Sequence, residues 1–370
     1  MNDLATLPFP LHRTVPKSDW TPPAGTRFIS SDDHQMEPPR LWEDRLTGED
    51  KARAPRHWQD EFNLHHLEVD GVSYDTPGFE PDNHPEGRPG FWDVKHRLAD
   101  MDAEGIEASV IFHQHAAALI RMQDKDLWFK CIDVFNEWLA EWRMAAPNRL
   151  FPVAYLPTIY KPEMSRDYMQ KIKDLGFKAV EIPSFPRGVR YNGKEMLPMW
   201  EAIAEAGLPL SMHVGVHIDA TGSGALGINM ARNMQPFYAL FPQLVFSGLF
   251  DRFPNLKIVF TEGGASWAAP SIANADKIYR DYAQVLRPKL EHKPSYYWHR
   301  NCWTTFMDDP VALDLIDWIG ADKMMWSIDY PHPEGVFGES MRIAKNIYDK
   351  AGEENFKKIV GGNAAALWGI

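Results

Sequence analysis

The sequence predicts an α/β fold, a single (β/α)8 barrel, and three observations support this prediction. First, eight short runs of apolar or β-branched residues alternate with longer segments of helical period. Second, the runs are nearly all apolar, which is typical of parallel strands covered by helices on both faces. Third, 370 residues is a common length for one such barrel with insertions. We therefore predict one domain over residues 1–370.

The predicted strands are spread along the chain from residue 27 to residue 329. Most are rich in Val, Ile, Phe and Met, and β-branched and aromatic residues are enriched in strands. In chain order they cover residues 27–32, 108–113, 151–157, 178–183, 209–214, 257–262, 302–306 and 324–329.

Helical patterns separate these strands, except after the first one. Apolar residues recur at intervals of three and four over residues 125–145, and the segment 198–207 begins with proline and ends with glycine. Residues 38–97 are instead rich in Pro, Gly, His and Asp. We predict that they form a long irregular insertion after the first strand. Loops of such length are usually functional or disordered, so we expect this insertion to act as a lid.

Composition limits the classes of function. The net charge is −12 and no run of Lys or Arg interrupts the acidic excess, which argues against a nucleic-acid partner. The two cysteines, Cys131 and Cys302, lie far apart and suggest a reducing compartment. No stretch of 18 uninterrupted apolar residues is present. We therefore predict a cytoplasmic enzyme with a small-molecule substrate, no nucleic-acid partner and no membrane association.

Polar residues that are unfavourable to bury follow several of the predicted strands at the point where each strand ends. Asp32 and His34 leave the first strand, His213 ends the fifth, Glu262 ends the sixth and Asp329 ends the eighth. In a barrel the carboxyl ends of the strands meet at one mouth. Imidazoles and carboxylates without thiolates suit a divalent cation such as Zn²⁺, Mn²⁺ or Fe²⁺.

Further polar residues are expected near the same mouth, where we predict that they bind substrate. For the two histidines after the second strand, a structural role is an equally good interpretation. For the arginine after the fourth strand, a surface ion pair is an equally good interpretation. The predicted substrate-binding residues are His113, His115, Arg187, His217 and His332.

A series of motifs resembles a known family, the amidohydrolase superfamily, in its branch that contains aminocarboxymuconate-semialdehyde decarboxylase. The motifs are "ISSDDHQMEPP", "RLADMDAEGIEASVIF", "LGFKAVEIP", "MHVG", "FPNLKIVFTEGG" and "WSIDYPHPEG". The resemblance implies a distorted (β/α)8 TIM barrel and a homodimer. It also implies that Asp32, His34, His213 and Asp329 are metal ligands.

Glu262 departs from that branch, whose decarboxylases carry a catalytic histidine at the corresponding place. A carboxylate is normally anionic and can bind metal or accept a proton. We therefore expect Glu262 to be a further ligand, with one or two divalent ions per chain. We also expect Asp329 and Glu262 to be catalytic in hydrolysis of an amide, ester, thioester or activated C–C bond of an aromatic or apolar substrate. Non-oxidative decarboxylation of an aromatic or unsaturated acid is the alternative.

Each of these residues also has an ordinary structural interpretation. A histidine at a strand end can be a core residue whose ring bonds to a backbone carbonyl. Asp329 could cap the helix after the last strand, since Asp is common at that position. Glu262 could merely neutralise a neighbouring charge. If these residues are ligands, their side chains should converge at the barrel mouth, whereas structural roles do not require them to meet.

Overall fold

The computed structural model describes residue 8 and residues 10–59, 65–74, 88–184, 186, 188–215, 221–232 and 234–370. Its centre is a set of parallel strands at all eight predicted places. They are β1 (Ile29–Gln35), β5 (Ala108–His113), β6 (Leu150–Pro152) continued by β7 (Ala154–Tyr155), β8 (Val180–Pro183), β9 (Leu210–His213), β10 (Ile258–Thr261), β11 (Cys302–Phe306) and β12 (Met324–Trp326).

The strands close into a ring. One sheet runs β1-β5-β6 and the other runs β12-β11-β10-β9-β8-β7. They join at Val153, whose backbone N–H donates to Ile111, while the next residue along, Ala154, donates to Ala179 of the neighbouring segment. On the other side the backbone N–H of Asp329 donates to Asp32 O at 2.9 Å. The distorted barrel predicted from the sequence is therefore confirmed.

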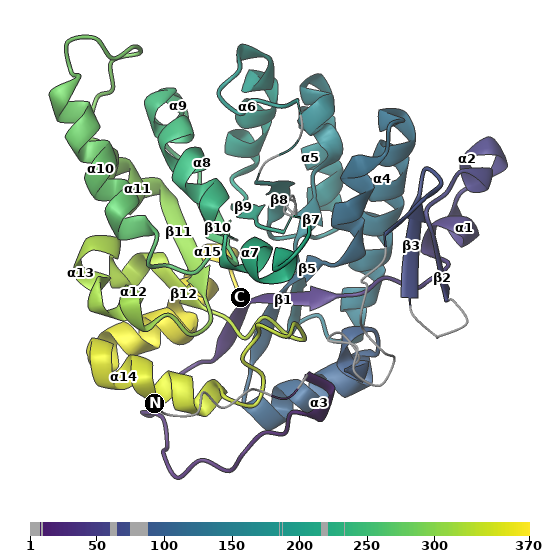
Figure 1. The fold of residues 1–370 in the computed structure, drawn as a ribbon, viewed down its shortest axis with the longest axis horizontal. Helices are drawn as coiled ribbons and strands as arrows, with labels where there is room; N and C mark the ends of the chain where they lie inside the picture. Colours follow the sequence, from purple (N-terminus) through teal and green to yellow (C-terminus); the bar gives the residue numbers. More distant parts are fainter. Residues whose placement is uncertain are drawn as a thin grey trace.

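Helices surround this ring (Figure 1). The predicted helix at 125–145 is α4, which begins after Asp124, whose carboxylate accepts from the N–H groups of Asp126 and Leu127. The predicted helix at 198–207 is α6, which ends at Gly207 in the left-handed conformation, with φ 71°. The larger outer helices are α4 (Lys125–Trp142), α5 (Ser165–Asp174), α6 (Leu197–Ala206), α8 (Gln235–Phe246), α10 (Ala268–Asp281), α11 (Pro294–Asn301) and α14 (Ser340–Lys357).

Shorter helices lie in the connections and at the C-terminal end of the chain. They are α7 (Ala225–Ala231), α9 (Leu249–Arg252), α12 (Pro310–Asp314), α13 (Ile316–Ile319) and α15 (Asn363–Trp368). No helix in the described part of the chain is long and apolar enough to cross a lipid bilayer.

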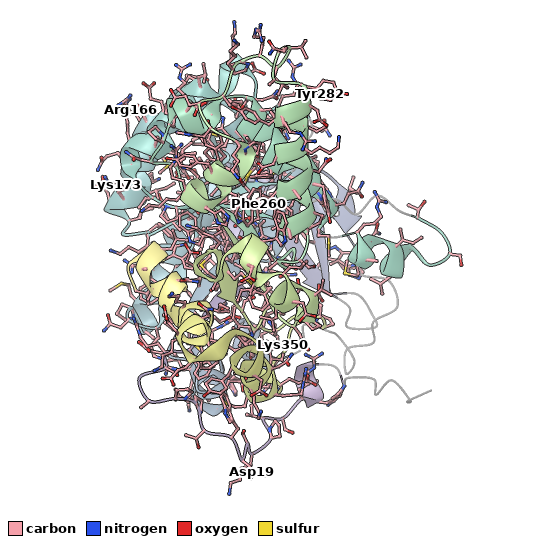
Figure 2. All side chains as sticks on the ribbon, turned by 90° about the vertical axis from the view of Figure 1, so that its left-hand side faces the viewer. Asp19, Arg166, Lys173, Phe260, Tyr282 and Lys350 are labelled. Atoms are coloured by element: carbon pink, nitrogen blue, oxygen red, sulfur yellow. The ribbon has the colours of Figure 1, made fainter. Side chains whose placement is uncertain are left out.

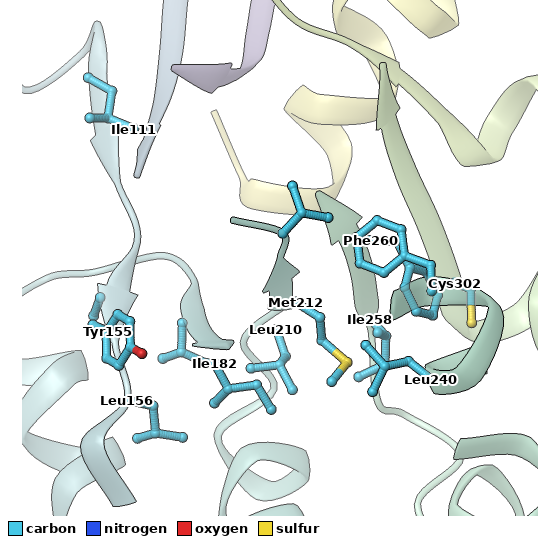
Figure 3. Close-up of a cluster of buried hydrophobic side chains, with 14 of the residues drawn as sticks. Ile111, Tyr155, Leu156, Ile182, Leu210, Met212, Leu240, Ile258, Phe260 and Cys302 are labelled. Atoms are coloured by element: carbon cyan, nitrogen blue, oxygen red, sulfur yellow. The ribbon is translucent and has the colours of Figure 1, made fainter. Parts of the chain in front are cut away.

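Alternate residues of the strands build two apolar layers. In β10, Ile258 and Phe260 belong to the large outer cluster, whereas Val259 belongs to a small inner one. Figure 3 shows the outer cluster, in which Leu210 of β9 and Leu240 of α8 lie close to the β10 side chains. Figure 2 places Phe260 in the middle of the molecule, with charged side chains at its edge. Helix burial against the sheet thus forms the main core.

The inner cluster fills the end of the barrel where the strands begin. It brings Ile29 and Val259 together with Leu367 and Trp368 of α15. The π-helix Lys358–Gly362, which leads into α15, approaches the start of β1 closely, because a Cβ atom on Gly361 would lie 2.2 Å from Arg27 O. Apolar side chains therefore fill the end of the barrel where the strands begin, and the polar residues lie at the other end, where the strands finish.

The insertion is more regular than the sequence indicated. It contains α1 (Leu41–Arg45), α2 (Gly48–Ala52) and an antiparallel sheet of β2 (Arg56–Gln59), β3 (His65–Val69) and β4 (Val72–Tyr74) in that order. The 3-10 helix Pro89–Phe91 and α3 (Val94–Glu104) lead back to the barrel. The prediction of an irregular segment is wrong here, while the role as a lid stays a prediction.

Candidate metal centre

Three imidazoles and three carboxylates meet at the carboxyl ends of the strands. They form two overlapping groups, in each of which the possible ligand atoms all lie within 4.8 Å of one another. The first group is Asp32, His34, His213 and Glu262, and the second is His34, Glu262, Asp329 and His332. All five residues predicted as ligands are therefore brought together.

β1 positions His34 through its backbone and its ring. Its backbone N–H donates to Tyr330 O at 2.7 Å, and its own carbonyl accepts from Arg97. Its ring Nδ1 lies 3.0 Å from His113 O, and because a carbonyl can only accept, Nδ1 carries the proton. The lone pair of Nε2 is then directed inward, 3.2 Å from Asp329 Oδ1 and 3.6 Å from Glu262 Oε2.

His213 is oriented by the same device at the end of β9. Its Nδ1 donates to Val214 O at 3.0 Å, which leaves Nε2 unprotonated in the neutral ring. Nε2 lies 3.0 Å from Glu262 Oε2 and 3.4 Å from Asp32 Oδ1. Backbone carbonyls thus turn the lone pairs of both rings toward the carboxylates, as a cation would require.

Two of the carboxylates are held on strained backbone. Among the described residues other than glycine, positive φ occurs at Asp70, Glu262 and Asp329, with φ 69° at Glu262 and 52° at Asp329. Glu262 N–H donates to Thr305 Oγ1 at 2.8 Å. Such conformations cost about 1–3 kcal/mol and cluster at functional sites. The capping alternative for Asp329 is excluded, because the next helix begins at Ser340.

Burial and mutual charge perturb the pKa values of this cluster. Burial lowers the pKa of His213, but the facing Glu262 and Asp32 outweigh it and raise the pKa to about 10. Burial raises the pKa of Asp32 to about 7, although His213 opposes the shift. Burial also acts to raise the pKa of Asp329, yet His332 and His34 hold it below its ordinary value. Protons on the imidazoles therefore stabilise the carboxylates, a task that a cation can take over.

The donor set fits a divalent metal ion. Several buried atoms at its centre have no hydrogen-bond partner among the described residues: Asp32 Oδ2, His34 Nε2, both carboxylate oxygens of Asp329, and His332 Nδ1. Buried polar atoms are rarely left unpaired. Imidazole and carboxylate ligands suit Zn²⁺, Mn²⁺ and Fe²⁺ alike, so the atoms indicate a metal without selecting one.

The residues predicted to bind substrate have different locations. His332 lies inside the second group, with Nδ1 2.9 Å from Asp329 Oδ1. His113 Nε2 lies 2.7 Å from Glu181 Oε1, and both side chains are buried. His115 lies in a 3-10 helix after β5, but its side chain is outside the described residues, as are Arg187 and His217 entirely.

Sequence reasoning missed Glu181. This acidic residue stands in the middle of β8, where its neighbours Val180 and Ile182 pack outward into the large core cluster. A charged residue within an otherwise apolar strand was the signal that could have revealed it, because Glu is almost never fully buried without a partner.

A cavity of about 380 Å³ opens beside Glu262. Its wall is partly apolar, and it is also lined by four carboxylates, those of Glu262, Asp308, Asp309 and Glu334. The lining includes Met230, Met234, Met307, Val336 and Glu334. The loop that follows β12 therefore contributes to this cavity as well as to the ligand cluster.

Comparison with known proteins identifies the family. A family model described as amidohydrolase matches residues 41–370. The chain belongs to the amidohydrolase family. The matched part contains His213, Glu262 and Asp329 and begins shortly after Asp32 and His34. This agrees with the resemblance inferred from the sequence motifs.

Two curated relatives of this amidohydrolase are decarboxylases. Gamma-resorcylate decarboxylase of Polaromonas sp. strain JS666 is 27% identical over 326 residues, which cover 82% of this chain and 96% of the relative. The 2-amino-3-carboxymuconate-6-semialdehyde decarboxylase of Dictyostelium discoideum is 22% identical over 292 residues, covering 75% and 77% of the two chains.

Solved structures share the fold. 5-Carboxyvanillate decarboxylase from Sphingomonas paucimobilis superposes with a TM-score of 0.70 at 23% identity, covering 94% of this chain and all (100%) of that one. A dihydroxybenzoic acid decarboxylase from Polaromonas sp. JS666, with bound manganese and 2-nitroresorcinol, gives a TM-score of 0.65 at 21% identity, covering 93% and 97%. These matches support an amidohydrolase-type barrel.

The comparisons overturn the expected reaction. Hydrolysis was predicted because Glu262 adds an anionic base, but the relatives named above are decarboxylases, so that prediction is wrong and the alternative is supported. The structure gives a physical reason. Oε2 of Glu262 lies against His213 and His34 within the ligand group, at 3.0 and 3.6 Å, so its charge is committed there.

Proposed function

We propose that this amidohydrolase is a metal-dependent, non-oxidative decarboxylase of an aromatic or unsaturated carboxylic acid. The observation that carries the proposal is the buried group Asp32, His34, His213 and Glu262 at the barrel mouth, whose ligand atoms lie within 4.8 Å of one another. Its presence in a chain whose curated relatives decarboxylate such acids favours that reaction over others of the family.

Asp32, His34, His213 and Glu262 would hold the ion, with the imidazoles binding through Nε2, and we propose Asp329 as a further ligand beside His34. A bound divalent cation such as Mn²⁺ would supply Lewis-acid stabilisation to the substrate's carboxylate and an adjacent oxygen. The side chains prepare for this, because Val214 O and His113 O fix both imidazoles in the required tautomer. Little reorganisation is then needed when the ion binds.

The cavity beside Glu262 suits the remainder of the substrate. Met230, Met234 and Met307 offer flexible apolar side chains, and methionine sulfur makes favourable contacts with aromatic rings. A volume of about 380 Å³ lies within the range of small-ligand sites. We therefore place the ring in this cavity, with its carboxylate toward His213 and His34.

Decarboxylation also requires a proton for carbon. The bond between the substrate carbon and its carboxylate breaks, the electron pair stays on carbon, and carbon dioxide leaves as carbon takes up the proton. We assign proton delivery to His113. Its Nε2 faces Glu181 at 2.7 Å, and its Nδ1 has no hydrogen-bond partner among the described residues. Imidazole suits this role because histidine is the side chain that most often acts as a general acid or base.

Release of carbon dioxide tests the proposed reaction directly. Mn²⁺-loaded protein would be incubated with 2,6-dihydroxybenzoate, 5-carboxyvanillate and related hydroxylated or unsaturated acids, while their esters and amides serve as hydrolysis controls. We expect carbon dioxide from at least one acid, and its loss both after chelation and in His213→Asn. Hydrolysis of an ester or amide, with no carbon dioxide from any acid, would overturn the proposal.

Hydrogen exchange tests the assignment of His113. A decarboxylase placed in D₂O with its phenolic product should exchange the ring hydrogen at the carbon that it protonates. We expect His113→Gln to slow both this exchange and turnover by about 10²–10⁴-fold, the usual contribution of a general acid. His96→Gln is the matched control, since that side chain is 61% exposed. Normal exchange in His113→Gln would move the role to another residue.

Two further predictions from the sequence remain to be measured. Analytical ultracentrifugation of the purified chain tests the predicted homodimer, and a sedimentation coefficient of a 42.4 kDa monomer at working concentration would refute it. Fractionation of the producing cells tests the predicted cytoplasmic location.

A further inference from the structure

We infer that the barrel mouth is a two-cation centre, in which Glu262 bridges the ions and His332 is a ligand of the second. The inference rests on the proposed function for the first ion and deepens it. It begins with the composition of the two overlapping groups. His34 and Glu262 are common to both, whereas Asp32 and His213 belong to the first and Asp329 and His332 to the second.

The chemistry of the shared residues decides which one can bridge. A neutral imidazole has one nitrogen lone pair for a metal, so His34 can serve a single ion. A carboxylate has two oxygens and can hold one ion with each. In Glu262, Oε2 faces His213 at 3.0 Å, while Oε1 faces His332 Nδ1 at 3.9 Å. The two oxygens therefore point to different groups, as a bridging carboxylate would.

Two imidazoles of the cluster lie side by side. The rings of His34 and His332 are stacked, with centroids 4.0 Å apart and an interplanar angle of 28°. Both direct a ring nitrogen at Asp329 Oδ1, at 3.2 Å for His34 and 2.9 Å for His332. In two-metal sites the ions lie about 3.5–4 Å apart. The two nitrogens reach the same carboxylate from separate rings, which leaves each one able to ligate a different ion of such a pair.

The hydrogen bonds of His332 set its lone pair. Its Nε2 lies 2.7 Å from Gln114 Oε1, and since this oxygen accepts, Nε2 carries the proton. Nδ1 of the neutral ring then directs a lone pair toward Asp329 Oδ1. At 2.9 Å the two lone pairs need a positive charge between them. In the metal-free protein a proton supplies that charge, and a cation shared by these two atoms would take the place of the proton.

The charge of the cluster also favours a second ion. Asp32, Glu262 and Asp329 are buried carboxylates, and together they carry three negative charges when ionised. One divalent cation leaves the centre with net negative charge, which would repel a substrate carboxylate. Two divalent cations leave it net positive, and the anionic substrate then completes the neutralisation.

Metal stoichiometry and electron paramagnetic resonance (EPR) test the inference without substrate. Chelator-treated protein would be loaded with Mn²⁺, freed of excess metal and analysed for manganese per chain. We expect about two ions per chain and the spectrum of an exchange-coupled pair, as expected for ions at the separation in two-metal sites. His332→Gln should retain about one ion with the six-line spectrum of isolated Mn²⁺, since it removes one ligand of the second ion alone.

A matched control and the wild type keep the test decisive. His96→Gln should keep both ions, and circular dichroism of each variant reports folding. Should His332→Gln fail to fold, the wild-type spectrum decides alone. A fully loaded wild type with one uncoupled Mn²⁺ per chain overturns the inference, as does His332→Gln with an unchanged coupled pair. One ion with carbon dioxide release leaves the proposed function standing, and two ions without it leave the two-cation centre standing.

Discussion

Asp33 lies between two of the proposed ligands, yet its carboxylate has a structural task. It is buried and accepts hydrogen bonds from Ser30 Oγ at 2.9 Å, from the backbone N–H of Tyr330 at 3.0 Å and from Ser109 Oγ. These bonds join β1 to β5 and to the segment after β12. We predict that Asp33→Ala destabilises the protein and displaces Asp32 and Asp329 relative to each other.

The size of the effect follows from the donors left behind. An unsatisfied buried donor costs about 1–3 kcal/mol. The hydroxyl of Ser30 can turn to Asp32 O, which is already 3.3 Å away, but the N–H of Tyr330 cannot rotate. We therefore expect a loss of about 3–5 kcal/mol in the free energy of unfolding. Metal affinity should also fall, by about 10–100-fold, as for other residues that orient ligands.

Asp33→Asn is the matched variant. Its amide oxygen can still accept from Ser30 and Tyr330, and its amide group can donate to Ser109. Burial raises the pKa of Asp33 to about 6, although Arg97 opposes the shift, so the charge itself is held at a cost. Asparagine removes the cost of burying this charge, and that gain offsets part of the stability lost through weaker hydrogen bonds. We expect the asparagine variant to unfold within about 1.5 kcal/mol of the wild type.

Urea unfolding of the metal-free proteins, followed by fluorescence, measures these differences, and metal titration of each variant measures affinity. The reasoning requires alanine to be clearly worse than asparagine in both. If the two variants unfold at the same midpoint, or if alanine matches the wild type, the three hydrogen bonds do not hold the strand as described.

Three other predictions need simpler measurements. Opposed carboxylates raise the pKa of His213 to about 10 and of His332 to about 9 against the effect of burial, so both rings are protonated at pH 7.5 without metal. A raised pKa means that each ring keeps its proton until the pH exceeds that value, so Mn²⁺ must displace these protons in order to bind. Mn²⁺ binding should therefore release protons and become tighter as the pH rises toward 9, which titration in weak buffer detects. An affinity for Mn²⁺ that does not depend on pH would contradict this. Gly335→Ala places a Cβ 2.3 Å from Asp329 O, so manganese content should fall and stability drop by about 1–3 kcal/mol, and full occupancy with unchanged melting would count against it. Burial raises the pKa of Cys131 to about 12 and also raises that of Cys302, so a thiol reagent should label neither in native protein and both in urea; fast native labelling would refute their burial.

The barrel was predictable because its strands are nearly continuous apolar runs. All eight predicted places carry a strand, and Pro198 and Gly207 marked one helix to within a residue at each end. The sheet of the insertion was not found. Its strands are three to five residues long and mostly polar, as in His65–Val69, so neither length nor alternation distinguishes them from a loop.

Five members of the proposed ligand cluster were predictable, but its arrangement was not. Strand ends place Asp32, His34 and His213 at one mouth whatever the loops do. The location of His332 depends on the loop after β12, which turns back so that Nδ1 meets Asp329 Oδ1. No periodic pattern encodes that turn. The tautomers likewise depend on carbonyls such as Val214 O, whose direction only the folded backbone defines.

Glu262 shows why residue type alone gave the wrong reaction. A carboxylate acts as a general base when a lone pair is free to take a proton from water at a workable pKa. Here burial acts to raise the pKa of Glu262, but His213 and His34 outweigh it and hold the pKa below its ordinary value, which makes the group a weak base. The same charge makes it a good ligand, and a ligand can serve decarboxylation as readily as hydrolysis. The reaction is therefore set by which group delivers a proton to which atom, and under the proposed function that group is His113, which faces Glu181 outside the ligand cluster.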